Sequence, residues 1–312
     1  MYNYLIYDLR VRSYFFLEGI SKEDFIGEAD IFIDKERENT IVTHEKNMRT
    51  KGEAQIYFEN EYLVLKYKND WKITIFKSGD LILVDENSHN LSHGLSILLG
   101  TGLSILMMYR DRIPLHAAAF LVENYAVGMV GKSGVGKSTF LRYVLEKGHK
   151  VLTEDTLLIC NRNDISVIPT RNIKSKLKKD AIDFFRIQPQ YIGSYIKSSN
   201  KYWVEILRQN RCQEQKVLKR IYFLNPREDT VDISVKRIEE REQFKRLCEN
   251  VNSLMDLPEK DVLKILKLLK EVSKKLITFE LTYPLGKEHF EETLKKLIEN
   301  EKECEEKNYG DV

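Results

Sequence analysis

Cysteine is scarce in this chain of 312 residues, and its four copies are scattered. Cys160, Cys212, Cys248 and Cys304 form no C-x-x-C pair. This spacing argues against both a clustered zinc site and a disulfide framework, so we expect reduced thiols. The N-terminus MYNYLIYDLR also lacks the basic start and the long apolar core of a secretion signal. Both absences favour a cytoplasmic protein.

An excess of charge of one sign is missing as well. Charged residues make up 31% of the chain, but the formal net charge is only +2. With positive and negative charges so nearly equal, the protein as a whole has no strong electrostatic potential that would attract nucleic acid or a membrane surface. The apolar run LSILLGTGLSILMMY, at 95–109, is shorter than the roughly 20 residues of a membrane-spanning helix. We expect a buried core helix there, and neither nucleic acid nor a membrane as a partner.

Three signatures of other nucleotide-binding classes are also missing. No N-K-x-D motif for guanine recognition, no LSGGQ-like segment of transporter ATPases and no long second domain of the helicase kind are found. The six histidines are dispersed, which gives no metal cluster for decarboxylation chemistry.

The first third of the chain is rich in short β-branched or aromatic segments that turn residues separate. This pattern predicts an antiparallel meander. The predicted strands are 29–33, 55–59, 62–67, 71–76 and 81–84. An apolar helix near 91–110 follows, and the next two buried strands are expected at 114–122 and 125–130.

The last quarter shows apolar residues at three- and four-residue spacing, which predicts helices. We expect these helices at 241–251, 261–275 and 288–300, and a frayed tail after Glu301. The chain is therefore predicted to be an α/β protein with a β-rich region over 1–90, a second domain over 91–312 and a helical C-terminus.

The segment GKSGVGKS, from Gly131 to Ser138, fits the Walker A pattern G-x-x-x-x-G-K-[ST] at every position. Glycines let backbone N–H groups converge on phosphate oxygens, and a helix predicted over 137–147 adds the positive end of its dipole. Lys137 can reach the β- and γ-phosphates, and the Ser138 hydroxyl can bind Mg²⁺. The residues expected to bind the cofactors ATP and Mg²⁺ are Gly131, Lys132, Ser133, Gly134, Val135, Gly136, Lys137, Ser138 and Thr139.

Two adjacent carboxylates, Glu154 and Asp155, end a short strand predicted over 150–153. We expect this strand to lie beside the strand that precedes the glycine-rich loop. One carboxylate can then hold Mg²⁺ together with Ser138, and the other can accept a proton from an attacking hydroxyl. The alternative is a solvated acidic pair that opens a loop.

The segment from His116 to Ile159 resembles the catalytic core of HPr kinase/phosphorylase, which is itself similar to phosphoenolpyruvate carboxykinase. The resemblance rests on His116, the loop 131–138, the sequence Lys-Gly-His at 147–149 and the pair Glu154-Asp155. It implies a P-loop core in which Asp155 is the catalytic base and Glu154 assists it or positions Mg²⁺. His116 would approach the phosphates or the acidic pair, unless it is a packed core residue.

The sequence departs from that family at several points. Glu154 stands where the family usually has Asp, Ala117 stands where it has Gly, and the glycine-rich signature of the phosphorylase activity is not found. The layout is similar to that of HPr-kinase-like proteins of peptide natural-product clusters, some of which phosphorylate a serine of a lasso peptide precursor. This resemblance implies transfer to a Ser or Thr hydroxyl of a peptide or small protein. A non-catalytic nucleotide-binding scaffold and a small-molecule kinase are the alternatives.

The acceptor, the preference for ATP over GTP and the oligomeric state stay open, although members of that family are often homo-oligomers. The basic segment RNIKSKLKK, at 171–179, suits an acidic peptide or phosphate charge, but a solvated face is the simpler interpretation. Arg211 and the pair Lys219-Arg220 are candidates to assist transfer. Tyr202 and Trp203 are candidates for an acceptor groove or for the core.

Overall fold

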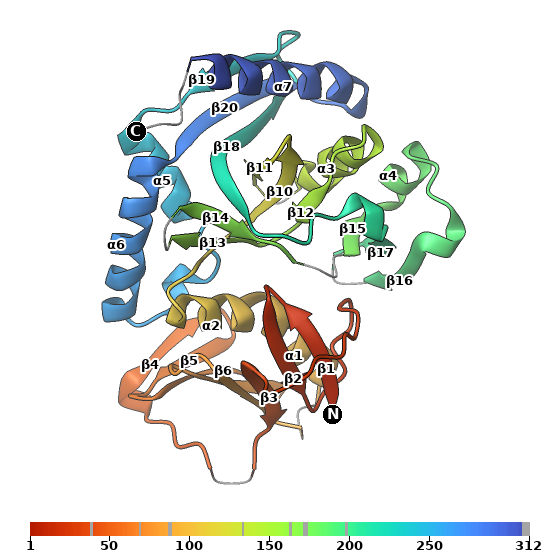
Figure 1. The fold of residues 1–312 in the computed structure, drawn as a ribbon. Coiled ribbons are helices and arrows are strands. Elements are labelled where there is room, and N and C mark those ends of the chain that lie inside the picture. The colour runs from red at the N-terminus through yellow and green to blue at the C-terminus, as the bar shows by residue number, and fades with distance from the viewer. Residues whose placement is uncertain are drawn as a thin grey trace. The chain divides into compact units, whose positions relative to one another are not determined.

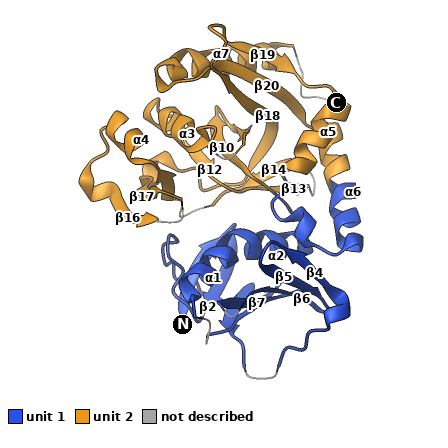
Figure 2. Ribbon diagram, turned by 180° about the vertical axis from the view of Figure 1, so that it is seen from behind, with its two compact units in different colours: residues 1–114, 251–268 blue, residues 115–250, 269–312 orange. Residues whose placement is uncertain are grey.

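A computed structural model describes residues 1–37, 40–68, 70–86, 89–132, 134–161, 164–170, 174–196 and 199–307. The chain is a mixed α/β protein with two compact units, coloured separately in Figure 2. Unit 1 contains residues 1–114 and 251–268, and unit 2 contains residues 115–250 and 269–312. These units divide the chain differently from the two regions expected, because 91–114 and 251–268 pack with the N-terminal strands.

Unit 1 is built on an eight-stranded sheet. Its strands are β1 (Tyr2–Ile6), β2 (Leu9–Ser13), β3 (Ile31–Lys35), β4 (Met48–Lys51), β5 (Ala54–Phe58), β6 (Tyr62–Tyr67), β7 (Trp71–Phe76) and β8 (Leu81–Val84). Their order in the sheet is β1-β2-β3-β8-β7-β6-β5-β4. The predicted antiparallel meander is correct from β5 to β8, whereas β1, β2 and β4 were not predicted. It is wrong for β3, which pairs parallel with both β2 and β8.

One apolar helix of 19 residues, Leu91–Tyr109, belongs to unit 1. It consists of α1 (Leu91–Ile97), a π-helical turn (Leu98–Gly102) and α2 (Leu103–Tyr109). Within the described residues it is the single helix whose length and composition would allow it to cross a membrane, and half of its most apolar window is buried. The helix is thus longer than its apolar run suggested. The residues of α2 from Leu103 to Met108 are buried, as expected of a core helix.

Unit 2 is built on a larger sheet. Its first strand along the chain is β9 (Ile113–Leu115), and the boundary between the two units falls within this strand. The other strands are β10 (Ala117–Val122), β11 (Tyr125–Val130), β12 (Val151–Thr153), β13 (Leu157–Asn161), β14 (Ile165–Ile168), β18 (Lys216–Arg227), β19 (Ser234–Arg237) and β20 (Ile277–Pro284). The order is β12-β10-β11-β18-β14-β13-β9, and β20 lies between β18 and β19.

Strand direction decides which loops of this sheet meet. Strand β10 is antiparallel to both β11 and β12, whereas β11 is parallel to β18 and β18 is parallel to β20. Consequently β11, β12, β18 and β20 all end at the sheet edge where β10 begins. Loops that follow these strands share that edge.

Three of the helices confirm the helical segments predicted for the last quarter. They are α5 (Glu240–Glu249), α6 (Glu259–Lys275) and α7 (Phe290–Glu306). The prediction overlooked β20, whose burial pattern marks it as a core strand between α6 and α7. It was also wrong about the first residues after Glu301, because α7 continues to Glu306 and Cys304 is buried.

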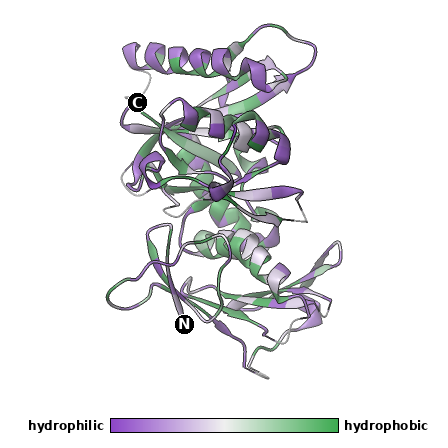
Figure 3. Ribbon diagram, turned by 90° about the vertical axis from the view of Figure 1, so that its right-hand side faces the viewer, coloured by the Kyte–Doolittle hydropathy of each residue, from purple (hydrophilic) through white to green (hydrophobic). Residues whose placement is uncertain are grey.

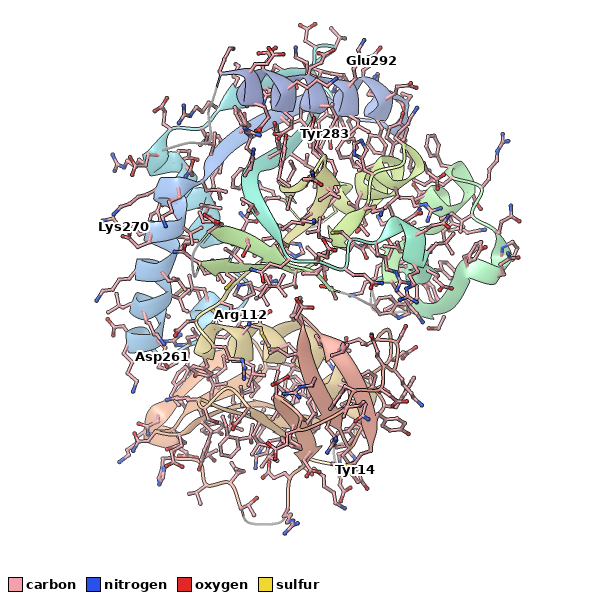
Figure 4. All side chains as sticks on the ribbon, viewed as in Figure 1. Tyr14, Arg112, Asp261, Lys270, Tyr283 and Glu292 are labelled. Carbon is pink, nitrogen blue, oxygen red and sulfur yellow. The ribbon has the colours of Figure 1, made fainter. Side chains whose placement is uncertain are left out.

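Helix α3 (Lys137–Glu146) and α7 pack on the sheet of unit 2 through aromatic side chains. Phe140 of α3 lies 6.2 Å from Tyr283 and 5.1 Å from Phe290 between ring centroids. In Figure 4, Tyr283 lies on the strand side of α7 and Glu292 on its outer side. Figure 3 shows the same division by colour, with green concentrated in the strands and purple along α7. This packing holds the start of α3 against the edge where β11 ends.

A separate three-stranded sheet in unit 2 has the order β15-β17-β16. Its strands are β15 (Lys174–Leu177), β16 (Ile192–Ile196) and β17 (Lys201–Glu205), and α4 (Lys179–Phe184) follows β15 (Figure 1). Leu177, Ile182 and Val204 belong to a small hydrophobic cluster on one face of this sheet. The opposite face is left to polar side chains.

Candidate active site

The residues singled out in the sequence gather at one edge of the unit 2 sheet. Ala117 pairs with Val130 across β10 and β11, and Ala119 pairs with Thr153 across β10 and β12. His116, the loop after Val130 and the pair after Thr153 therefore lie at the same edge. The expectation that β12 lies beside β11 was wrong, since β10 separates them. Because both strands run in the same direction, their ends still meet.

The glycine-rich loop has a conformation that only glycine adopts easily. Gly134 and Gly136 have φ angles of 85° and 96°, in the left-handed region. A Cβ atom on Gly131 would lie 2.6 Å from Cγ1 of Val135, so a larger residue would displace the loop. The turn lets α3 begin at Lys137, with the Phe140 N–H donating to the Gly136 carbonyl at 2.8 Å.

The start of α3 presents its first N–H groups toward this loop. The leading N–H groups of a helix, here those of Lys137, Ser138 and Thr139, have no acceptor within the helix. With ten residues, α3 is long enough for a useful dipole at this end. Ser133, also expected to bind phosphate, lies outside the described residues.

Lys137 bridges the loop and the strand β10. Its side chain is only 7% exposed, and its Nζ donates to the Gly131 carbonyl at 2.8 Å and to His116 Nε2 at 3.0 Å. Burial lowers the pKa of Lys137, and the positive charge of Lys201 lowers it further, while Asp155 opposes the shift. The ammonium group therefore has two hydrogen-bond acceptors, and a phosphate oxygen could take the place of either one.

His116 connects this lysine to the acidic pair. If Nε2 accepts from Lys137, the imidazole carries its proton on Nδ1, which lies 3.5 Å from Asp155 Oδ1. Burial lowers the pKa of His116, and the charge of Lys137 adds to that shift. Both causes favour the neutral ring near neutral pH. The structure thus places His116 at the site and not in a purely apolar core.

Glu154 and Asp155 lie in different environments in the bend that follows β12. Glu154 is 5% exposed, and its Oε1 accepts from Ser175 Oγ at 3.0 Å and from the Lys176 N–H at 3.1 Å. Burial raises the pKa of Glu154, while hydrogen bonds that include one to Ser138 oppose the shift. The side chain of Asp155 is 61% exposed. Only Asp155 is open to a large acceptor.

The oxygen atoms at this edge form a donor set that suits Mg²⁺. The Ser138 hydroxyl lowers the pKa of Glu154, and Asp155 is adjacent to Glu154 in the sequence. Mg²⁺ is usually held by one or two carboxylates together with phosphate oxygens and waters. Clusters of three or more His, Cys, Asp or Glu residues that could hold a metal alone are absent from the described parts of the chain. The residues therefore fit Mg²⁺ together with a phosphate ligand.

The arginines that the sequence offered as assistants lie elsewhere. Arg220 is fully buried, and its guanidinium binds Glu301 at 2.7 Å and Glu305 at 2.6 Å. Arg211 donates from Nε to the Ile206 carbonyl at 2.6 Å. Arg220 is therefore occupied by a buried ion pair, and Arg211 is hydrogen-bonded to the backbone five residues before it.

Lysine side chains of the three-stranded sheet approach the acidic pair instead. Lys176 Nζ lies 3.7 Å from Asp155 Oδ2, and the positive charge of Lys201 helps to lower the pKa values of His116 and Lys137. Lys176 belongs to the basic segment that was interpreted as a solvated face. The run of positive charges around Lys176 could have identified it as a site residue, but no local pattern in the sequence marked Lys201.

The comparisons with known proteins add little to this geometry. No protein-family model matches the chain, and no curated protein matches it. Among solved structures, the Hpr(Ser) kinase/phosphatase from Coxiella burnetii is similar over 63% of this chain and 93% of its own, with 10% identity and a TM-score of 0.34. A TM-score of this size carries no argument, so the functional interpretation depends on the residues of this chain.

Proposed function

We propose that the chain is an ATP- and Mg²⁺-dependent kinase that transfers a phosphoryl group to a Ser or Thr hydroxyl of a peptide or small protein. A natural-product precursor peptide, such as a lasso peptide precursor, is one acceptor of this kind. The observation that carries the proposal is the chain of contacts from Lys137 through His116 to Asp155, with distances of 3.0 and 3.5 Å. These contacts join the loop proposed to bind phosphate to an exposed carboxylate.

Each group has a distinct task in this proposal. The N–H groups at the start of α3 and the ammonium of Lys137 hold the phosphates, and Ser138 with Glu154 holds Mg²⁺. The bound nucleotide and metal supply the phosphoryl group and offset its negative charge. Asp155 accepts the proton of the acceptor hydroxyl, and its exposure gives a macromolecular acceptor access.

Neutral His116 orients the base without competing for the proton. Its Nδ1 side faces Asp155, and its Nε2 side faces Lys137. Because burial keeps the pKa of His116 low, the ring does not add a positive charge next to Lys137. The carboxylate of Asp155 therefore keeps its orientation while it accepts the proton.

The test is phosphoryl transfer from labelled ATP, with Mg²⁺, to a library of peptides that contain Ser or Thr. Wild-type protein should label peptides on the hydroxyl, and the Asp155→Asn variant should lose most of that activity. Asp183→Asn is a matched control, because this carboxylate is also exposed but pairs with Lys179 on α4. Nucleotide binding without transfer to any peptide or small alcohol would show a scaffold instead. Transfer to small alcohols alone would show a small-molecule kinase.

A further inference from the structure

The polar face of the three-stranded sheet carries two lysines and a tryptophan. Side chains alternate along β15, so Ser175 and Leu177 are buried while Lys176 is on the opposite face. Lys176 pairs directly with Trp203 of β17. Lys201 lies two residues before Trp203 and therefore shares this face.

Lys176 is held next to the candidate base by three contacts. Its backbone N–H donates to Glu154 at 3.1 Å, its Nζ lies 3.7 Å from Asp155 Oδ2, and its Nζ lies 5.0 Å from the centre of the Trp203 ring. The backbone contact ties β15 to the end of β12. The ring contact limits where the ammonium group can go.

Lys201 contributes a second positive charge to the same region. It is the first residue of β17, two positions before Trp203, so its side chain projects from the same face of the sheet as Lys176. Lys176 thus contacts the exposed carboxylate of Asp155 directly, Lys137 is connected to it through His116, and Lys201 lies on the same face as Lys176. The cations outnumber the accessible anion, and a site with such an excess is suited to a further anionic group.

We propose that Lys176 and Lys201 bind the terminal phosphate of the nucleotide and make the site prefer a nucleoside triphosphate to a diphosphate. This inference rests on the proposed function. Lys137 reaches the β-phosphate, which ADP and ATP share, as well as the γ-phosphate, whereas Lys176 contacts Asp155, which must approach the acceptor hydroxyl next to the γ-phosphate. The two lysines would supply the charge that is often supplied by an arginine in phosphoryl transfer.

Calorimetric titration with AMP-PNP and with ADP, both with Mg²⁺, tests this inference without an acceptor. Lys176→Met and Lys201→Met should each weaken AMP-PNP binding about tenfold or more, because a charge-assisted hydrogen bond is lost, and should change ADP binding less than about twofold. Lys176→Arg should restore most of the AMP-PNP affinity. Lys179→Met is the matched control, because its side chain is 67% exposed and pairs with Asp183.

Fluorescence of Trp203 provides a second readout that does not depend on affinity alone. In a Trp71→Phe background, AMP-PNP should change the Trp203 emission by drawing Lys176 from the ring, and ADP should change it less. The Lys176→Met variant should lose this difference.

The outcomes separate this inference from the proposed function. If wild-type protein binds neither nucleotide, the proposed function fails and the inference fails with it. If wild-type protein binds both, but the lysine variants lose AMP-PNP and ADP equally or lose neither, only the inference is overturned.

Discussion

Replacement of Lys137 by methionine is the most direct test of the glycine-rich loop. In the wild type, the ammonium group of Lys137 donates to the Gly131 carbonyl at 2.8 Å and to His116 Nε2 at 3.0 Å. Methionine keeps an unbranched apolar side chain but removes this ammonium group. If the loop binds a nucleotide, the variant should bind both AMP-PNP and ADP more weakly than the wild type, because Lys137 reaches the β-phosphate that both nucleotides carry.

The expected size of this loss follows from the bonds that Lys137 exchanges. A hydrogen bond between charged groups contributes about 1.5–3 kcal/mol, which corresponds to about 10–150-fold in the dissociation constant. Lys137 must give up two existing hydrogen bonds to reach a phosphate, so the net effect should lie in the lower part of this range. We expect a loss of about 10–30-fold for each nucleotide.

The assay is isothermal titration calorimetry with Mg²⁺, and Lys132→Met is the matched control. Lys132 lies in the same loop, but its side chain is exposed and only its backbone is expected to face phosphate. The control should therefore change the affinity less than about twofold. If both variants bind AMP-PNP as tightly as the wild type does, or if both lose affinity equally, the reasoning about the loop is refuted.

The pH dependence of the same titration provides an independent check. Burial lowers the pKa of Lys137, so its ammonium loses its proton at a lower pH than the usual lysine value of about 10.4. Wild-type affinity for AMP-PNP should fall as the pH rises through that lowered pKa, and the Lys137→Met variant should lack this step. A wild-type affinity that stays constant up to pH ~10.4 would contradict the assignment.

Three further predictions concern catalysis, stability and pH. Asp155→Asn should lower phosphoryl transfer about 10²–10⁴-fold, measured as initial rates. It should change the free energy of unfolding by less than about 0.5 kcal/mol, since this side chain is 61% exposed, and an unchanged rate would remove its role as the base. Glu301→Gln should lower the free energy of unfolding in urea by about 1–3 kcal/mol, because it removes one of the two carboxylates that pair with the buried Arg220, whereas an unchanged free energy would contradict this pairing. Burial lowers the pKa of His116, so the unfolded chain takes up that proton first as the pH falls below about 6.5. The contribution of His116 to stability is therefore fully present above about pH 6.5 and is lost as the pH falls to the pKa that His116 has in the folded state. Thermal denaturation of His116→Gln should show a smaller decline from pH 7 to 5 than wild type, and equal declines would contradict the shift.

Local features of the site could be predicted from the sequence because short-range patterns encode them. The glycines that need positive φ angles, the start of α3 at Lys137 and the strands on either side are specified by residues within about ten positions of one another. The same holds for the central strands of unit 1, where β-branched residues and turns alternate. In these segments prediction and structure agree.

The tertiary structure decided which of these groups work together. Burial separates Glu154 from Asp155 although they are neighbours in the chain, and it places the hydrogen-bond partners of Glu154 at Ser175 and Lys176. The charged tail after Glu301 was expected to fray, but it stays helical to Glu306, and Glu305 binds Arg220 from 85 positions away. Pairing between distant strands is set by the packing of the whole sheet, and no local pattern records it.

By itself, the sequence determined that the chain contains a loop suited to phosphate and two carboxylates close behind it. Only the tertiary structure decided that β10 lies between β11 and β12, that His116 joins Lys137 to Asp155, and that lysines of a separate small sheet face the same site. The physical reason is that a loop conformation depends on neighbouring residues, whereas the environment of a charged group depends on everything that packs around it.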